Sequence, residues 1–474
     1  MRPHKRRREN VENVENKKQR KPINRQNGSR PLLPHEKERT MNIREEARKM
    51  KLDAPLLAAS SNETRNEALR LIGEALAARK EEIFAANAQD CADAEKNGIA
   101  PAVMKRLLFN DAKLDDVCRG IEQLISLPDP IGRALLKREL DTDLVLTRIS
   151  VPIGVIGVIF EARPDALVQI STLCLKSGNC AILKGGKETA RTNRVLFSII
   201  REAAVRAGLP ASCLLQAELH NEIDELLQCE KDVDLLIPRG SNQFVQYIMN
   251  NTKIPVMGHA DGICHIYVDK EADQEMAARV ILDAKTQYTA ACNAVETILI
   301  HRDIAQAFLP RLADAFREAD VKLRGTREAA DLLAASAAAN TGSIEIMEEE
   351  DFHTEYLDLI ASVKVVADIE EAIDHINRYG SHHTDAILTR DDEAAACFLQ
   401  MVDSAGVYRN CSTRFADGFR YGFGAEVGIS TSKLHARGPV GLDGLVTYKY
   451  TLCGSGQIVG DYAAGRSSFH FRDL

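Results

Sequence analysis

The sequence predicts an α/β protein with two open domains whose sheets are rich in parallel strands. Near-continuous apolar segments, such as residues 151–160 and 180–183, alternate with segments of helical periodicity, such as residues 189–207. This alternation is typical of parallel sheets covered by helices. The 474 residues suffice for two or three domains. The composition is that of a globular protein, and no apolar run approaches the roughly 18 residues that a membrane span needs.

The first forty residues differ from the rest of the chain. They hold 13 Lys and Arg against 5 Asp and Glu, a net charge of +8, whereas the remainder carries −16. They are poor in large apolar side chains, so we expect them to stay disordered. The basic run at residues 5–8 would suit nucleic acid, but we favour a solvated tail or an extension from an early start codon. An apolar secretory segment is not evident.

The elements follow in order along the chain. Residues 42–127 show helical spacing of apolar side chains and predict a set of helices. Residues 140–149 alternate partly and predict one arm of an exposed hairpin at about 135–150. Residues 233–237 and 254–268 are expected to be further buried strands of the first sheet.

A second unit of the same kind begins near residue 286. In this unit the sequence predicts strands at 296–300 and 362–366 and helices at 304–318 and 327–337. The unit runs to about residue 417. The final stretch, 444–458, is strand-like and is expected to pair with the hairpin arm, which across two subunits would form a dimer. The tail after Asp461 is expected to be disordered.

Two glycine-rich turns follow predicted strands, where open parallel sheets bind ligands. They are Lys184-Gly185-Gly186-Lys187 and Pro238-Arg239-Gly240-Ser241-Asn242. Glycines before a helix allow a phosphate to approach the backbone. Neither turn has the GxGxxG or Walker pattern, so ordinary turn chemistry is an equal alternative.

Cys292 is the strongest candidate for a reactive residue. Small uncharged residues precede it, and the apolar strand 298–300 follows closely. A thiolate attacks activated acyl groups to form thioesters, although many free cysteines are only small core residues. The eleven cysteines are odd in number and include no CxxC pair. This argues against a disulfide framework or a zinc site and favours a reducing, cytoplasmic setting.

Several segments together resemble the aldehyde dehydrogenase superfamily and, within it, the γ-glutamyl phosphate reductases (glutamate-5-semialdehyde dehydrogenases). The resemblance covers about residues 43–460. It is carried by segments 151–164, 175–187, 259–265, 286–297, 375–387, 412–415, 424–430 and 434–439.

The resemblance implies an aldehyde dehydrogenase-like fold: two open α/β domains plus a small β oligomerisation arm. We expect a basic extension (1–40), a cofactor-binding domain (41–285), a catalytic domain (286–417), and a return segment with the oligomerisation strand and tail (418–474).

The resemblance also implies a chemistry. Cys292 would attack the acyl phosphate of γ-glutamyl phosphate, releasing phosphate and forming a thioester. NADPH would then reduce this thioester to glutamate 5-semialdehyde. The backbone N–H groups of Cys292 and Asn293 would hold the oxyanion. The cofactor NADPH/NADP would be held by Lys184, Gly185, Gly186, Gly240, Ser241 and Glu355.

Departures from the superfamily pattern narrow this expectation. His259-Ala260-Asp261-Gly262 stands where hydrolytic members carry a water-activating glutamate, which favours a phosphorylating reductase. Arg163 stands near the place of an oxyanion asparagine and would form a fork for phosphate or carboxylate. The alternative is a surface salt bridge. The candidates for holding the substrate's amino-acid end or the leaving phosphate are Ser381, His383, Thr384 and Arg414. The mechanism requires no metal.

The expected partners are a small-molecule substrate, further copies of the chain in a dimer or tetramer, and transiently a glutamate 5-kinase. We expect no membrane association. Two alternatives stay open: a hydrolytic or CoA-linked aldehyde dehydrogenase, and a nucleic-acid binder built on a retired dehydrogenase scaffold.

Overall fold

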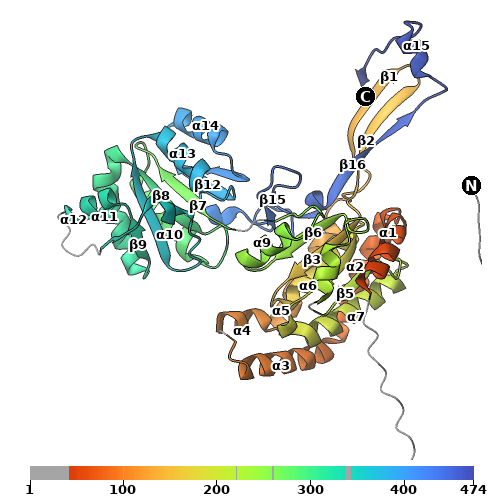
Figure 1. The fold of residues 1–474 in the computed structure, drawn as a ribbon, viewed down its shortest axis with the longest axis horizontal. Coiled ribbons are helices and arrows are strands. Elements are labelled where there is room, and N and C mark those ends of the chain that lie inside the picture. Colours follow the sequence, from red (N-terminus) through yellow and green to blue (C-terminus); the bar gives the residue numbers. More distant parts are fainter. Residues whose placement is uncertain (1–41, 100, 220, 259–260, 337–342) are drawn as a thin grey trace, which may run out of the picture. The chain divides into compact units, whose positions relative to one another are not determined.

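The structure is a computed structural model that describes residues 42–474, apart from 100, 220, 259–260 and 337–342 (Figure 1). The predicted basic extension lies outside the described residues. The predicted helical region is confirmed. Asn42, Ser61 and Asn110 cap three of its helices, each accepting a backbone N–H three residues on. The helices are α1 (Ile43–Ala58), α2 (Asn62–Ala78), α3 (Lys80–Lys96), α4 (Pro101–Leu107) and α5 (Asp111–Ser126).

The first sheet contains four parallel strands in the order β5-β4-β3-β6. Almost every residue of β3 and β4 is buried, as expected for a parallel sheet with both faces covered. Its strands are β3 (Val155–Phe160), β4 (Cys180–Lys184), β5 (Leu214–Ala217) and β6 (Leu235–Arg239). The helices of this unit are α6 (Pro164–Lys176), α7 (Ala190–Arg206), α8 (Asn221–Leu227) and α9 (Asn242–Asn250).

The second sheet contains seven parallel strands in the order β10-β9-β11-β8-β7-β12-β13. Its strands are β7 (Cys264–Val268), β8 (Val295–His301), β9 (Lys322–Gly325), β10 (Glu345–Ile346), β11 (Ile360–Val366), β12 (Thr384–Leu388) and β13 (Gly406–Arg409). Its helices are α10 (Gln274–Thr286), α11 (Arg302–Glu318), α12 (Arg327–Ala334), α13 (Ile369–Tyr379) and α14 (Asp392–Met401).

One predicted strand differs from the structure. The sequence assigned residues 254–268 to the first sheet. Residues 255–257 do pair with Leu236 of β6 in an isolated bridge, whereas Cys264–Val268 forms a strand that pairs with β8 and β12 of the second sheet. Thus β7 precedes the predicted domain boundary at residue 285. A strand buried on both faces has the same apolar pattern in either sheet, so the pattern does not reveal its partners.

The predicted hairpin is β1 (Ala134–Asp141) with β2 (Leu144–Pro152). The C-terminal strand β16 (Val446–Cys453) pairs with β2 of the same chain over eight residues. Figure 1 shows β1, β2 and β16 side by side, with α15 (Val459–Ala463) beyond them. We call β16, β2, β1 and β17 (Arg472–Asp473) the arm sheet.

The expectation of a disordered tail was wrong. After Asp461 the chain returns along the arm, and β17 pairs antiparallel with β1. The ring of Phe469 stacks on Tyr462 with 4.2 Å between centroids, and Arg138 forms an ion pair with Asp473. The aromatic rings of Tyr462, Phe469 and Phe471 provide this packing. Among the described residues, no helix is long and apolar enough to cross a membrane.

Candidate active site

Three neighbouring strands of the second sheet, β8, β7 and β12, bring the site together. Parallel strands begin at the same edge of a sheet, so the residues just before them converge. Cys292 precedes β8, Gly262 precedes β7, and His383 precedes β12. Behind this edge, the backbone N–H of His265 donates to Asp385 Oδ1 at 2.7 Å and ties β7 to β12.

Gly262 lies directly against the nucleophile candidate. A Cβ atom at this position would stand 2.2 Å from the carbonyl oxygen of Cys292 and 2.5 Å from its Cα and Cβ. Only glycine fits such a close approach of two backbones. The hydroxyl of Ser381 accepts the N–H of Ile263 at 2.8 Å and fixes the segment that carries Gly262. Ser381, a predicted substrate ligand, therefore stands behind the site.

The imidazole of His383 contacts the thiol. Its Nε2 lies 3.1 Å from Cys292 Sγ, and its Nδ1 lies 2.9 Å from Thr384 Oγ1. The tautomer protonated at Nδ1 donates to Thr384 and leaves Nε2 to accept the thiol proton. His383 is buried and Cys292 is half-buried, so the thiol stays accessible beside a sheltered base. The left-handed backbone of His382, at φ 59°, turns the chain into β12 at this point.

The backbone around Cys292 offers hydrogen-bond donors. Among the described residues, neither the Cys292 nor the Asn293 N–H group has a hydrogen-bond acceptor. The Asn293 side chain donates to the carbonyl of Ala416 at 2.8 Å, and Thr413 Oγ1 donates to the Asn293 carbonyl at 2.7 Å. These two contacts fix the peptide that carries the predicted oxyanion donors.

Arginines approach the same place from two sides. Arg414 is buried, its Nε donates to Gln287 Oε1 at 2.9 Å, and its guanidinium lies 5.9 Å from the centre of the Tyr288 ring. Burial lowers the pKa of Arg414, and Cys292 is close enough to act on this pKa.

Arg239, at the end of β6, was not predicted as a site residue. Burial and the neighbouring Arg163 lower its pKa, and Cys292 also acts on this pKa. Its side chain has no hydrogen-bond or ion-pair partner within the described part of the chain, although the carboxylates of Glu426 and Asp165 are near enough to raise its pKa. A guanidinium whose N–H groups are not engaged, beside a nucleophile, favours an anionic ligand. The sequence held a signal for it, because Arg239 lies in a predicted ligand-binding turn.

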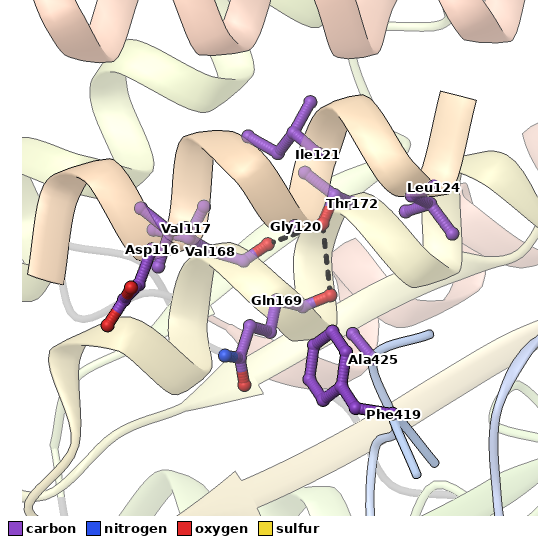
Figure 2. A pocket seen from close by; sticks show the side chains of 10 residues that line it. All are labelled: Asp116, Val117, Gly120, Ile121, Leu124, Val168, Gln169, Thr172, Phe419 and Ala425. Atoms are coloured by element: carbon purple, nitrogen blue, oxygen red, sulfur yellow. Dashed lines mark hydrogen bonds between the residues drawn. The ribbon is translucent and has the colours of Figure 1, made fainter. Parts of the chain in front are cut away.

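Arg163 stands at the start of α6 and pairs with the buried Asp165 at 3.1 Å. Lys113 shares this carboxylate at 3.3 Å. Both cations border a cavity of about 330 Å³ between α5 and α6. Figure 2 shows the adjoining apolar part, where Phe419 lies beside Gln169 and faces the two helices.

The two glycine-rich turns were predicted to form a cofactor cradle. Lys184 is buried, its Nζ donates to the Gly185 carbonyl at 2.7 Å, and burial lowers its pKa. A Cβ at Gly186 would lie 2.4 Å from Glu188 Oε2, and one at Gly240 would lie 3.0 Å from Glu161 Cδ. Both glutamates end in flexible carboxylates, but a Cβ at Gly186 would also lie 3.1 Å from the backbone nitrogen of Ala162, so a side chain there would crowd a turn that a phosphate-bearing ligand needs open.

Two further observations bear on the cradle. Asn193 Oδ1 is buried without a hydrogen-bond partner among the described residues, beside Gly185. Ser241 is the N-cap of α9 and makes no side-chain cap hydrogen bond. The residues present thus fit a dinucleotide.

Glu355 is half-buried and lies after the short 3-10 helix Glu349–His353, close enough to raise the pKa of Glu296.

Among the residues that the structure describes, no group of three or more His, Cys, Asp or Glu side chains is placed to hold a metal ion. His259 and Ala260, which belong to the segment that replaces the water-activating glutamate of hydrolytic members, lie outside the described residues.

Comparisons with known proteins agree with this geometry. Residues 15–350 match the model of the Aldehyde dehydrogenase family. The γ-glutamyl phosphate reductase of Pelotomaculum thermopropionicum is 55% identical over 434 residues, covering 92% of this chain and 98% of that protein. The one from Acetivibrio thermocellus is 54% identical, covering 90% and 97%. The crystal structure of γ-glutamyl phosphate reductase from Thermotoga maritima superposes with a TM-score of 0.84 at 37% identity, covering 88% of this chain and all of that one.

Proposed function

We propose that this chain, which belongs to the aldehyde dehydrogenase family, reduces γ-glutamyl phosphate to glutamate 5-semialdehyde with release of phosphate. This is the reductive step of proline synthesis from glutamate. The observation that carries the proposal is the contact between Cys292 and His383 at 3.1 Å. Beside it lie two arginines and the N–H groups of Cys292 and Asn293, which have no acceptor among the residues that the structure describes.

The first step forms a thioester. His383 Nε2 takes the proton of the Cys292 thiol, and the sulfur attacks the acyl carbon. The N–H groups of Cys292 and Asn293 stabilise the negative oxygen of the tetrahedral intermediate. The C–O bond to phosphate then breaks, and the imidazolium gives its proton to the leaving phosphate. Thr384 keeps the imidazole oriented through this transfer.

Arg239 and Arg414 neutralise the phosphate as it leaves. Arg414 is buried and Arg239 is half-buried, and this partial exclusion of water strengthens their interaction with an anion. Arg163 and Lys113 border the neighbouring cavity and suit the substrate's α-carboxylate. Ser381 supports the site from behind.

When bound, NADPH would supply the hydride that turns the thioester into a thiohemiacetal alkoxide. This alkoxide collapses to the aldehyde and the Cys292 thiolate. Lys184, Gly185, Gly186, Gly240, Ser241 and Glu355 would hold the cofactor. Lys187 next to the cradle favours NADPH over NADH, because a cation pairs with a 2′-phosphate. His383 returns a solvent proton to the thiolate, so one proton is consumed overall.

Three wider proposals accompany the function. The arm sheet joins two subunits, supported by the exposed side chains of Tyr448, Tyr450 and Leu452 on β16. The protein acts in a reducing cytoplasm, supported by eleven free cysteines. A glutamate 5-kinase delivers the labile acyl phosphate by transient association.

The test runs the reaction in reverse. Purified protein is mixed with glutamate 5-semialdehyde and NADP, with and without inorganic phosphate, beside a Cys292→Ala variant. Absorbance from NADPH should require both phosphate and Cys292. Equal rates without phosphate would show that the thioester is hydrolysed and would overturn the proposal.

A further inference from the structure

A buried ion pair closes the turn that carries Cys292. Lys285 lies in the last turn of α10, and Glu296 is the second residue of β8. Lys285 Nζ donates to Glu296 Oε2 at 2.6 Å, and both side chains are fully inaccessible to solvent. Residues 286–295, including the nucleophile, form the loop between these two anchors.

The pair is not explained by stability. Removing two charges from water is expensive, and an apolar pair of similar volume is commonly as stable or more stable. Burial raises the pKa of Glu296 to about 7 and lowers the pKa of Lys285, so the protein interior works against both charges. A different role for the pair is therefore indicated.

The second oxygen of Glu296 reaches another segment. Glu296 Oε1 accepts the backbone N–H of Leu357 at 3.4 Å. Leu357 adopts a left-handed backbone with φ 53°, which is uncommon for a large branched side chain. Lys285 Nζ lies 6.0 Å from the centre of the Tyr356 ring, whose hydroxyl lies 2.8 Å from Ser362 Oγ on β11.

The carboxylate thus joins the two segments that the reaction must align. One carries Cys292, where the acyl group is held, and the other carries Glu355, two residues before Leu357. We propose that the Lys285–Glu296 pair is a positioning device that fixes the spacing between the nucleophile turn and the Glu355 segment. The proposal rests on the proposed function for its kinetic consequence.

The central test replaces both charges at once. In Lys285→Met/Glu296→Leu no unpaired charge is left in the interior, so the variant should unfold at a urea concentration equal to or above that of the wild type. A displacement of about 1 Å at the site costs roughly 100-fold in rate. We therefore expect kcat of the phosphate-dependent reverse reaction to fall about 100-fold, with the KM for phosphate within about threefold.

The control is Arg409→Met/Asp392→Leu, which removes a largely exposed ion pair of 2.7 Å from the same unit. It should leave kcat unchanged. A second variant, Glu296→Gln, keeps one oxygen that can accept from the Leu357 N–H or from Lys285 Nζ, although its amide nitrogen cannot accept from the other donor. It should retain far more activity than the double variant, even if the double variant folds poorly. If the pair only stabilised the fold, activity would follow stability in all three variants.

A readout without catalysis separates this inference from the proposed function. Amide hydrogen exchange should rise in residues 286–294 and 355–358 of the double variant and stay unchanged elsewhere in the second sheet. If the wild type reduced NADP equally fast without phosphate, the proposed function would be rejected but the positioning role would not. A folded double variant with kcat within twofold of the wild type and unaltered exchange in both segments would reject the positioning role.

Discussion

Substituting Gly262 by alanine tests the closest contact in the site. The new Cβ would stand 2.2 Å from the Cys292 carbonyl oxygen, whereas ordinary contacts begin at 3.4 Å. The two backbones must therefore separate by about 1.2 Å. A misplacement of about 1 Å costs on the order of 100-fold in rate, which corresponds to roughly 2.7 kcal/mol of transition-state stabilisation.

The assay is kcat/KM for phosphate-dependent NADP reduction, together with the rate at which iodoacetamide alkylates Cys292. Gly258→Ala is the matched control, because its nearest neighbour would lie at an ordinary 3.7 Å. Gly262→Ala should lose about 100-fold in kcat/KM and alkylate at an altered rate, while Gly258→Ala stays within about twofold of the wild type. If Gly262→Ala kept its wild-type kcat/KM, the close packing of these two backbones would not constrain the nucleophile.

Three further outcomes are expected. His383→Asn should lower kcat/KM by roughly 100- to 10,000-fold, because a positioned base is lost. Steady-state kinetics measure this loss, and thermal unfolding checks that the variant is folded. An unchanged kcat/KM would refute the role of His383 as the base for Cys292. Arg239→Met should raise the KM for phosphate roughly 10- to 100-fold, because a charge-assisted hydrogen bond contributes about 1.5–3 kcal/mol, with Arg409→Met as the control that should not change. Burial raises the pKa of Glu296 to about 7, above its ordinary value of 4.5, so it contributes stability below about pH 4.5 that is lost as pH rises towards 7. Urea unfolding at several pH values should therefore show the wild type losing free energy of unfolding relative to Glu296→Gln across this window, and a constant difference would contradict the raised pKa.

The sequence reveals the nucleophile better than the groups around it. Cys292 stands in a distinctive local context, a turn of small residues before an apolar strand. Its contact with His383 spans 91 residues and depends on β7 lying between β8 and β12. Local pattern predicts a strand but not its neighbours. The histidine was therefore expected near the substrate, and its contact with the thiol emerged only from the strand order.

Arg239 and the C-terminal tail show two other limits. Arg239 lay in a turn that was already a candidate site, but a guanidinium without a partner is visible only once its surroundings are known. The tail after Asp461 shows no helical or strand periodicity, and it was expected to be disordered. Its order comes from pairing with a strand more than 300 residues earlier, between Glu139 and Arg472.

The pairing of β16 with β2 also has a consequence for synthesis of the chain. The two strands join residues as distant as Val145 and Cys453. A ribosome adds about 5–20 residues per second, so β2 waits roughly 15–60 seconds for its partner. During that time one edge of the hairpin is open to pairing with other nascent chains. We expect aggregation during expression to originate at this edge, and slower translation of the segment between the two strands to worsen it.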